Sequence, residues 1–263
     1  MERVDVDGMA IAFERAGSGP PIVLLHGGMS DHREWRAQLD DLSDSFTVLA
    51  WDAPGCGGSD DPPAGFAMAD YADALAGFLA TLGIGSAHLV GLSWGSTLAL
   101  ELYRRHPHVV RTMILTAAYA GWAGSLAPEE VAERLAAALQ GLEEPPEAYA
   151  REWLPTLLTD RAPEELRAEL VRIMASYHPE GTRAMLNAIV AADLRDVLPT
   201  IAVPTLLLAG EEDVRSPRAV QEELHARIPG STMRRVPGAG HQCTMEAPAA
   251  FDDAVRSFLS ERG

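Results

Sequence analysis

The stretch Gly91–Gly95, with the sequence Gly-Leu-Ser-Trp-Gly, constrains this chain more than any other. An apolar run over residues 87–90 precedes it and predicts a buried strand, and an apolar run over residues 96–103 follows it and predicts a helix. A serine at such a turn sits in strained backbone at a helix N-terminus, where the helix dipole favours developing negative charge. The two glycines remove Cβ atoms that would collide with the crossing strand and helix. We therefore predict that Ser93 is a nucleophile; an ordinary turn serine is the alternative.

A nucleophilic serine needs a base, and the base needs an orienting acid. Asp213 follows the apolar run 204–210, which predicts a strand, after a short acidic turn. Glu211 and Glu212 stand in the same turn and are close rivals for the role of the acid. We favour Asp213.

The base that we predict is His241, because it ends a Gly-rich loop, Gly-Ala-Gly-His, that can bring an imidazole over the edge of the sheet. In this hypothesis Ser93 Oγ attacks an acyl carbon, His241 takes its proton and later delivers it to the leaving group, and Asp213 holds the imidazole tautomer. The alternative is that His241 is a structural loop histidine. Cys243 is expected to be buried near the site, with thiol catalysis as the minor alternative.

The developing oxyanion needs backbone donors near Ser93. We expect the amides of Trp94 and of Gly28 or Met29 to form this oxyanion hole, because a predicted strand ends just before His26-Gly-Gly-Met. His26 itself is expected to brace that loop without exchanging protons with the substrate.

The composition excludes several kinds of chemistry. All 21 basic residues are Arg, so a Schiff-base mechanism and a P-loop, which both need Lys, are ruled out. The net charge of −17 disfavours nucleic-acid and membrane-surface partners. The Gly-rich stretches 17–19 and 55–58 do not complete a dinucleotide-binding fingerprint, and no spacing predicts a metal site. We therefore expect no cofactor and no metal.

The two cysteines, Cys56 and Cys243, make no disulfide framework. The acidic N-terminus is too polar for a signal peptide, and no apolar run approaches the length of a membrane span. We expect a cytoplasmic protein that acts on a small molecule; the sequence leaves its oligomeric state open.

Strands and helices alternate through most of the chain. We predict a hairpin over residues 3–16, strands over residues 21–25, 46–51, 87–90, 109–116, 204–210 and 233–236, and helices that begin near Ser30 or Asp31 and cover residues 67–82, 96–103, 217–228 and 249–259.

Residues 121–199 differ from the rest because they contain helical patterns broken by prolines and no strand-like run. The domain organisation that we predict is an α/β core, residues 1–120 and 200–263, with residues 121–199 as a helical insertion over the carboxyl ends of the strands. We expect an apolar substrate pocket lined by Tyr119, Trp122, Met174 and Met185. Packing of the insertion onto the core is the alternative for the aromatic and Met residues of this segment.

These motifs together resemble the α/β-hydrolase superfamily over nearly the whole core. The residues that carry the resemblance are His26–Gly28, Asp52–Asp60, the elbow 91–95, the acid after Gly210, and Gly240-His241 followed by Glu246 and Pro248. Within the superfamily the chain is similar to lid-bearing esterases and 3-oxoadipate enol-lactonase-like hydrolases. The resemblance implies a mostly parallel eight-stranded sheet flanked by helices, a helical lid, and hydrolysis of a carboxylic ester or lactone through an acyl-enzyme.

Some members of the superfamily are disfavoured by the sequence. Dehalogenases and epoxide hydrolases use Asp as nucleophile, whereas this chain has Ser93 at that position. Hydrolysis of a C–C bond in a diketone-type substrate and a cofactor-free perhydrolase activity both stay open, since they use the same triad. From a different class, a hydrolase-like ligand receptor stays open too, although a binding role needs no aligned nucleophile, base and acid.

Overall fold

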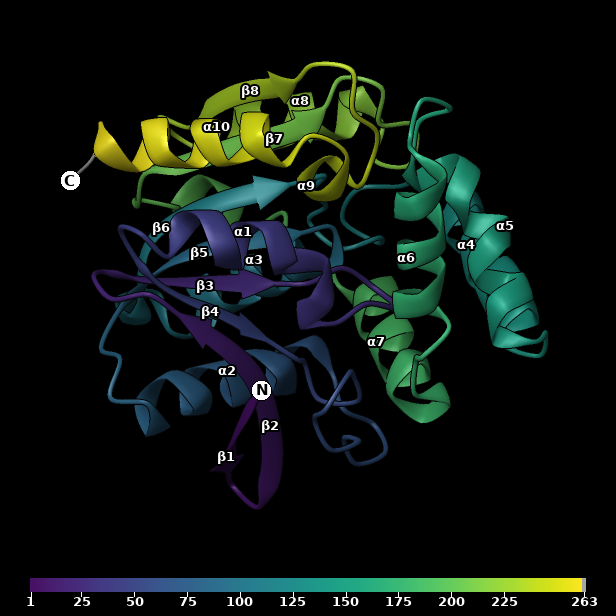
Figure 1. The fold of residues 1–263 in the computed structure, drawn as a ribbon, viewed down its shortest axis with the longest axis horizontal. Helices are drawn as coiled ribbons and strands as arrows, with labels where there is room; N and C mark the ends of the chain where they lie inside the picture. The colour runs from purple at the N-terminus through teal and green to yellow at the C-terminus, as the bar shows by residue number, and fades with distance from the viewer. Residues whose placement is uncertain (262–263) are drawn as a thin grey trace.

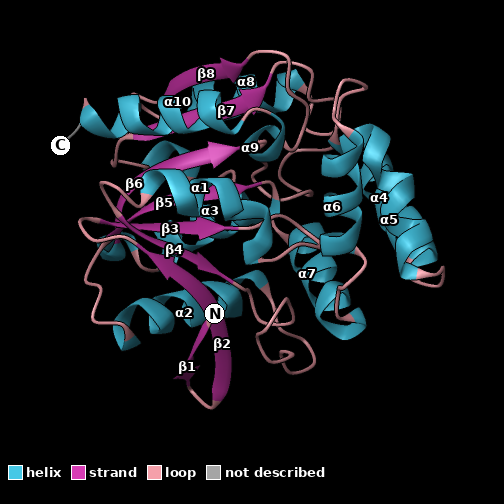
Figure 2. Ribbon diagram, in the orientation of Figure 1, coloured by secondary structure: helices cyan, strands magenta, loops and turns pink. Residues whose placement is uncertain are grey.

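Eight strands form one sheet in the computed structural model, which describes residues 1–261 (Figures 1 and 2). They are β1 (Glu2–Val6), β2 (Met9–Ala16), β3 (Pro21–Leu25), β4 (Thr47–Trp51), β5 (Ala87–Leu92), β6 (Val110–Thr116), β7 (Thr205–Gly210) and β8 (Thr232–Val236). Their order across the sheet is β1-β2-β4-β3-β5-β6-β7-β8. β2 pairs antiparallel with β1 and β4, and all other pairs are parallel. The sheet is therefore mostly parallel.

Helices cover both faces of this sheet. Within the described chain they are η1 (His32–Trp35), α1 (Arg36–Leu42), α2 (Met68–Thr81), α3 (Trp94–Arg105), η2 (Pro107–Val109), α4 (Pro128–Gly141), α5 (Pro146–Leu157), α6 (Glu164–Met174), α7 (Pro179–Ala191), η3 (Leu198–Thr200), α8 (Arg218–Arg227), α9 (Cys243–Glu246) and α10 (Pro248–Ser260). None of these helices combines the length and the apolar character needed to cross a bilayer.

The apolar core lies in two layers, because successive residues of a strand point to opposite faces of the sheet. In β3, Val23 and Leu25 belong to the cluster that includes α2 and α3. Ile22 and Leu24 belong to the cluster that includes α1 and α10. All four side chains are fully buried, and each such burial contributes about 1.5–3 kcal/mol. This explains why the parallel strands are continuous apolar runs in the sequence.

Helices α4 to α7 lie together beyond the carboxyl ends of the parallel strands, on the side toward which the arrows of these strands point (Figure 1). They belong to the segment 121–199, called the helical segment below, which contains no strand. One of its connections to the core is a hydrogen bond from Trp94 Nε1, on α3, to Met185 O, on α7, at 3.1 Å.

The eight-stranded, mostly parallel sheet flanked by helices that was expected from the sequence is confirmed. Asp31 is the N-cap of η1, since its side chain accepts a hydrogen bond from Arg33 N. The short helix α9 over Cys243–Glu246 was not predicted from the sequence. The side chain of His32 is 12% exposed, and its Nδ1 lies 2.8 Å from Oδ1 of the buried Asp52.

Candidate active site

The turn between β5 and α3 places Ser93 in the strained backbone region that the sequence suggested. Its φ of 53° and ψ of −108° are rare for a residue with a side chain. Glycine is required on either side: a Cβ at Gly95 would lie 2.1 Å from Leu25 O, and one at Gly91 would lie 2.5 Å from Gly95 O. The backbone of α3 therefore crosses the end of β3 at a distance that only glycine allows.

Hydrogen bonds hold this strained turn against the neighbouring strand β6. Ser93 N donates to Thr116 O at 2.8 Å. Ser96 Oγ lies within hydrogen-bond distance of Gly91 O, at 2.7 Å, and of Thr116 O, at 2.9 Å. Ser96 is thus both small enough for the crossing and a link between the two sides of the turn.

His241 and Asp213 form a buried pair at the carboxyl ends of the last strands. His241 Nδ1 lies 3.1 Å from both carboxylate oxygens of Asp213, and both side chains are almost completely buried. Asp213 Oδ1 also accepts hydrogen bonds from the amides of Arg215 and Ser216, each at 2.9 Å. Burial alone would raise the pKa of the Asp213 carboxyl, but the charge and hydrogen bond of His241 and the two amides outweigh it and lower that pKa. The carboxylate therefore stays ionised beside the imidazole.

The two rivals of Asp213 lie elsewhere. Glu212 pairs with Arg161, and Glu211 Oε2 accepts a hydrogen bond from Gly238 N at 3.4 Å. Both glutamates are exposed. Among the three acids of this turn, Asp213 is the one that contacts His241.

The amides predicted for the oxyanion hole border the cavity that contains Ser93. Gly28, Met29 and Trp94 all line it, and none of their amides has a hydrogen-bond partner within residues 1–261. Trp94 is the first residue of α3, so its amide belongs to the free N-terminal end of a helix. Met29 has a φ of 56°, which turns the loop back after β3.

His26 connects this loop to the loop after β4. Its Nε2 accepts a hydrogen bond from Ala53 N at 3.0 Å, so its proton is on Nδ1, which lies 2.7 Å from Gly27 O. Burial lowers the pKa of His26. The imidazole is therefore neutral and braces the loop, as its place in the sequence indicated.

Glu34 is a buried acid behind the same loop that sequence reasoning missed. It is 2% exposed, and its Oε1 accepts a hydrogen bond from Gly27 N at 2.9 Å. Its Oε2 has no hydrogen-bond partner within the described chain. Burial raises the pKa of Glu34 to about 7, although the bond from Gly27 opposes this shift.

Glu246 connects the loop that carries His241 to the helical segment. Its Oε2 accepts a hydrogen bond from Gly240 N at 2.6 Å, and its Oε1 accepts from Thr159 N and Oγ1, each at 2.8 Å. Gln242 N donates to Leu157 O at 3.0 Å. The position of the imidazole thus depends on the helical segment as well as on the core.

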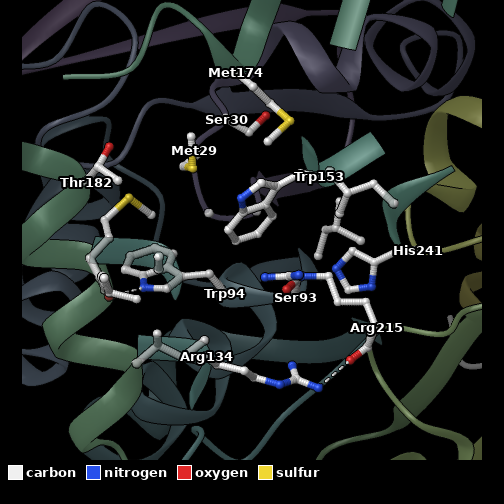
Figure 3. Close-up of a pocket in the computed structure, with 18 of the residues that line it drawn as sticks. Met29, Ser30, Ser93, Trp94, Arg134, Trp153, Met174, Thr182, Arg215 and His241 are labelled. Atoms are coloured by element: carbon white, nitrogen blue, oxygen red, sulfur yellow. Dashed lines mark hydrogen bonds between the residues drawn. The ribbon is translucent and has the colours of Figure 1, made fainter. Parts of the chain in front are cut away.

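A cavity separates the strand ends from the helical segment, and Ser93 and His241 both line it (Figure 3). The four residues expected in the substrate pocket, Tyr119, Trp122, Met174 and Met185, all line it too. Most of the remaining lining is apolar, and α4, α5 and α7 contribute Ala138, Tyr149, Trp153, Leu157, Leu186 and Ile189 to it.

Two arginines in this cavity were not singled out from the sequence. Arg134 reaches it from α4 and Arg215 from the loop before α8. Arg215 stands two residues after Asp213, but with 21 arginines in the chain nothing in the sequence alone marks it as a pocket residue.

One group of side chains within residues 1–261 has the spacing of a metal site: Asp31, His32 and Asp52. The carboxylate oxygens of this group already accept hydrogen bonds or form ion pairs within the protein. Asp52 accepts hydrogen bonds from His32 and, at 2.7 Å, from Gly58 N, while Asp31 pairs with Arg33. The group acts as a polar support beneath the loop after β3.

Comparison with known proteins agrees with this architecture. The model of the alpha/beta hydrolase fold family matches residues 20–248. A 2-(acetamidomethylene)succinate hydrolase of Mesorhizobium japonicum is 28% identical over 269 residues, which cover 98% of this chain and 94% of that protein. Among solved structures, a thermophilic esterase from Thermogutta terrifontis is 32% identical with a TM-score of 0.90, covering 99% of both chains. The enol-lactonase from Burkholderia xenovorans is 28% identical with a TM-score of 0.90, covering 98% of this chain and 100% of that one.

The crossing at Gly95 predicts a large loss of stability on a small substitution. Gly95→Ala is expected to lower the free energy of unfolding by about 3 kcal/mol or more, because its Cβ would overlap backbone atoms that cannot move aside. Urea unfolding followed by circular dichroism measures the change. Gly85→Ala is the matched control, since a Cβ there meets nothing within 4 Å; equal stability of the two variants would contradict the crossing.

The raised pKa of Glu34 predicts a pH-dependent stability. Between the unfolded pKa of a Glu, about 4.3, and the folded value of about 7, the native state holds a proton that the unfolded state has lost, so stability falls as pH rises. Glu34→Gln has no proton to lose, so this pH-dependent loss of stability is absent in the variant. From pH 5 to pH 8 the free energy of unfolding of Glu34→Gln should therefore rise by roughly 2 kcal/mol relative to the wild type.

Urea unfolding at both pH values tests this expectation. The exposed Glu165 provides the control, because Glu165→Gln should show no such difference from the wild type. A constant difference between Glu34→Gln and the wild type across this pH range would refute the shift.

Proposed function

The chain belongs to the α/β-hydrolase fold family, and on that premise we propose that it is a serine hydrolase that cleaves a carboxylic ester or lactone through an acyl-enzyme. The observation that carries this proposal is that Ser93 and His241 line one cavity while a buried carboxylate, that of Asp213, contacts His241 from behind it. Ser93 sits on the strained turn, His241 lines the same cavity, and Asp213 holds His241 through its Nδ1. A binding role would need no such arrangement.

In the first half of the reaction Ser93 Oγ attacks the acyl carbon while His241 Nε2 takes the hydroxyl proton. The ionised Asp213 fixes the proton of the imidazole on Nδ1 and stabilises the imidazolium. The tetrahedral intermediate then collapses, His241 gives its proton to the leaving alkoxide oxygen, and the acyl group remains on Ser93.

In the second half a water molecule attacks the acyl carbon, and His241 takes one of its protons. Collapse of the second tetrahedral intermediate breaks the bond to Ser93 Oγ, which recovers a proton from His241. The products are the carboxylic acid and the free enzyme. A lactone differs only in that its alcohol and acid remain one molecule.

The oxyanion of each intermediate is stabilised by the amide of Trp94 and by an amide of the Gly28–Met29 loop. Within the described part of the chain, residues 1–261, these amides have no other hydrogen-bond partner, and their residues border the cavity. One such donor contributes about 3–4 kcal/mol to the transition state. His26 and Glu34 keep the loop in place by their hydrogen bonds to Ala53 and Gly27.

The helical segment, residues 121–199, serves in this proposal as a lid over a core made of residues 1–120 and 200–263. Its helices provide Trp153, Met174 and Met185 to the cavity, and Tyr119 and Trp122 border it near the end of β6. Their apolar side chains favour the hydrocarbon part of a small-molecule substrate. The choice of esters and lactones is supported by the esterase and the enol-lactonase that the chain resembles.

Hydrolysis of 4-nitrophenyl esters from acetate to octanoate tests the proposal. The wild type should release 4-nitrophenol. Ser93→Ala should lower kcat by about 10⁵-fold or more and Asp213→Asn by about 10⁴-fold, because each removes a member of one catalytic unit. A fluorophosphonate probe should label the wild type at Ser93, as located by mass spectrometry of the peptides.

Ser257→Ala provides the control, because Ser257 lies on α10, whereas the cavity is lined by other elements. Turnover that survives in Ser93→Ala would show that another residue is the nucleophile. Folded wild type that neither hydrolyses the esters nor reacts with the probe would overturn the serine-hydrolase proposal.

A further inference from the structure

Arg215 places a positive charge inside the cavity. Its side chain leaves the loop between β7 and α8 and points into the cavity that contains Ser93 and His241 (Figure 3). The centre of its guanidinium group lies 3.8 Å from the centroid of the Trp153 ring. This stacking holds the planar group in one orientation.

The guanidinium group of Arg215 has no protein anion to neutralise it. Within residues 1–261 no carboxylate lies within salt-bridge distance of it, and none of its nitrogens donates a hydrogen bond to the protein. Arg134, in the same cavity, differs in both respects. It pairs with Glu130 at 2.7 Å and donates to Tyr119 Oη at 3.2 Å and to Arg215 O at 3.2 Å.

Arg215 is half-buried and keeps its charge. Partial burial lowers the pKa of its guanidinium to about 10, which leaves the group protonated at neutral pH. Because part of its hydration is lost and no carboxylate of residues 1–261 replaces it, an anionic partner in the cavity would be favourable. An unpaired arginine inside a cavity that also contains a nucleophile therefore indicates a partner that arrives with the substrate.

The rest of the cavity strengthens this contrast. Among residues 1–261 no Asp or Glu side chain lines the cavity, although the chain has 38 acidic residues and a net charge of −17. The carboxylate of Asp213, two residues before Arg215 in the chain, already accepts hydrogen bonds from His241 and from two backbone amides. The cavity is thus a positively charged site in an acidic protein.

Building on the proposed function, we propose that Arg215 binds a carboxylate of the substrate and so selects esters or lactones that carry a second, ionised carboxyl group. A guanidinium presents two parallel N–H donors that match a carboxylate in a bidentate pair. Because Arg215 and Ser93 line one cavity, a single small molecule can place its carboxylate on the first while its acyl carbon meets the second.

Matched pairs of esters test this selectivity. One pair is 4-nitrophenyl hexanoate and mono-4-nitrophenyl adipate, whose six-carbon acyl chains end in a methyl group or a carboxylate. The other pair is the butyrate esters of methyl 4-hydroxybenzoate and of 4-hydroxybenzoate, which place the carboxylate on the leaving group. The wild type should prefer the anionic member of at least one pair in kcat/KM.

Three variants locate the source of that preference. Arg215→Gln should lower the anionic-to-neutral ratio of kcat/KM by about 30-fold, because it removes one partner of a desolvated charge pair. Arg215→Lys should restore part of the ratio. Arg218→Gln is the matched control, since it removes an equal charge from an exposed side chain on α8 and should leave the ratio unchanged. Circular dichroism and thermal unfolding establish that each variant is folded.

The outcomes separate this inference from the proposed function. Wild type that hydrolyses neutral esters without preferring the anionic member of either pair, or an Arg215→Gln variant that slows all esters equally, overturns the carboxylate site and leaves the serine hydrolase standing. If no ester is turned over and Ser93 is not labelled, the proposed function fails. The binding of adipate, measured by the quenching of tryptophan fluorescence, then tests the carboxylate site. Binding to the wild type that Arg215→Gln abolishes supports the carboxylate site, and no binding to the wild type overturns it.

Discussion

The close crossing of α3 over the end of β3 is the contact on which the rest of the site depends. At Gly95 the helix backbone approaches Leu25 O so closely that a single added Cβ would overlap it. This approach fixes where the helix begins, and therefore where Ser93 and the amide of Trp94 lie relative to the loop after β3. The strain at Ser93 is tolerated because β5, which leads into the turn, is buried along its whole length and hydrogen-bonded to β3 and β6 on either side.

Buried polar groups support the loops around this crossing. His26 and Glu34 fix the loop after β3 by accepting hydrogen bonds from Ala53 N and Gly27 N. Glu246 fixes the loop of His241 against the helical segment by accepting a hydrogen bond from Gly240 N. Each support is a hydrogen bond to a backbone amide of a loop that has no regular structure of its own. Because these carboxylates and the imidazole are buried or half-buried, such bonds are costly to lose, so they keep loops from distant parts of the chain in one arrangement.

Much of the fold could be predicted from the sequence, because its strands are continuous apolar runs that only burial on both faces explains. The helix predicted over residues 67–82 is α2, Met68–Thr81, and the one over 217–228 is α8, Arg218–Arg227. The short helix α9 and the burial of His32 could not be predicted. Both result from packing: Cys243 on α9 is fully buried, and His32 is held by Asp52 from another strand end.

The sequence by itself determined the turn chemistry, because a strand, Gly-x-Ser-x-Gly and a helix are local features that neighbouring residues specify. It also supplied the candidate His241 and favoured Asp213 over Glu211 and Glu212, although these three acids differ little in sequence context. Only the tertiary structure buries Asp213 against His241 and leaves the two glutamates exposed. It alone decided which arginines enter the cavity and that Arg215 stacks on Trp153, because this stacking joins residues far apart in the chain, and such a contact exists only once the chain has folded.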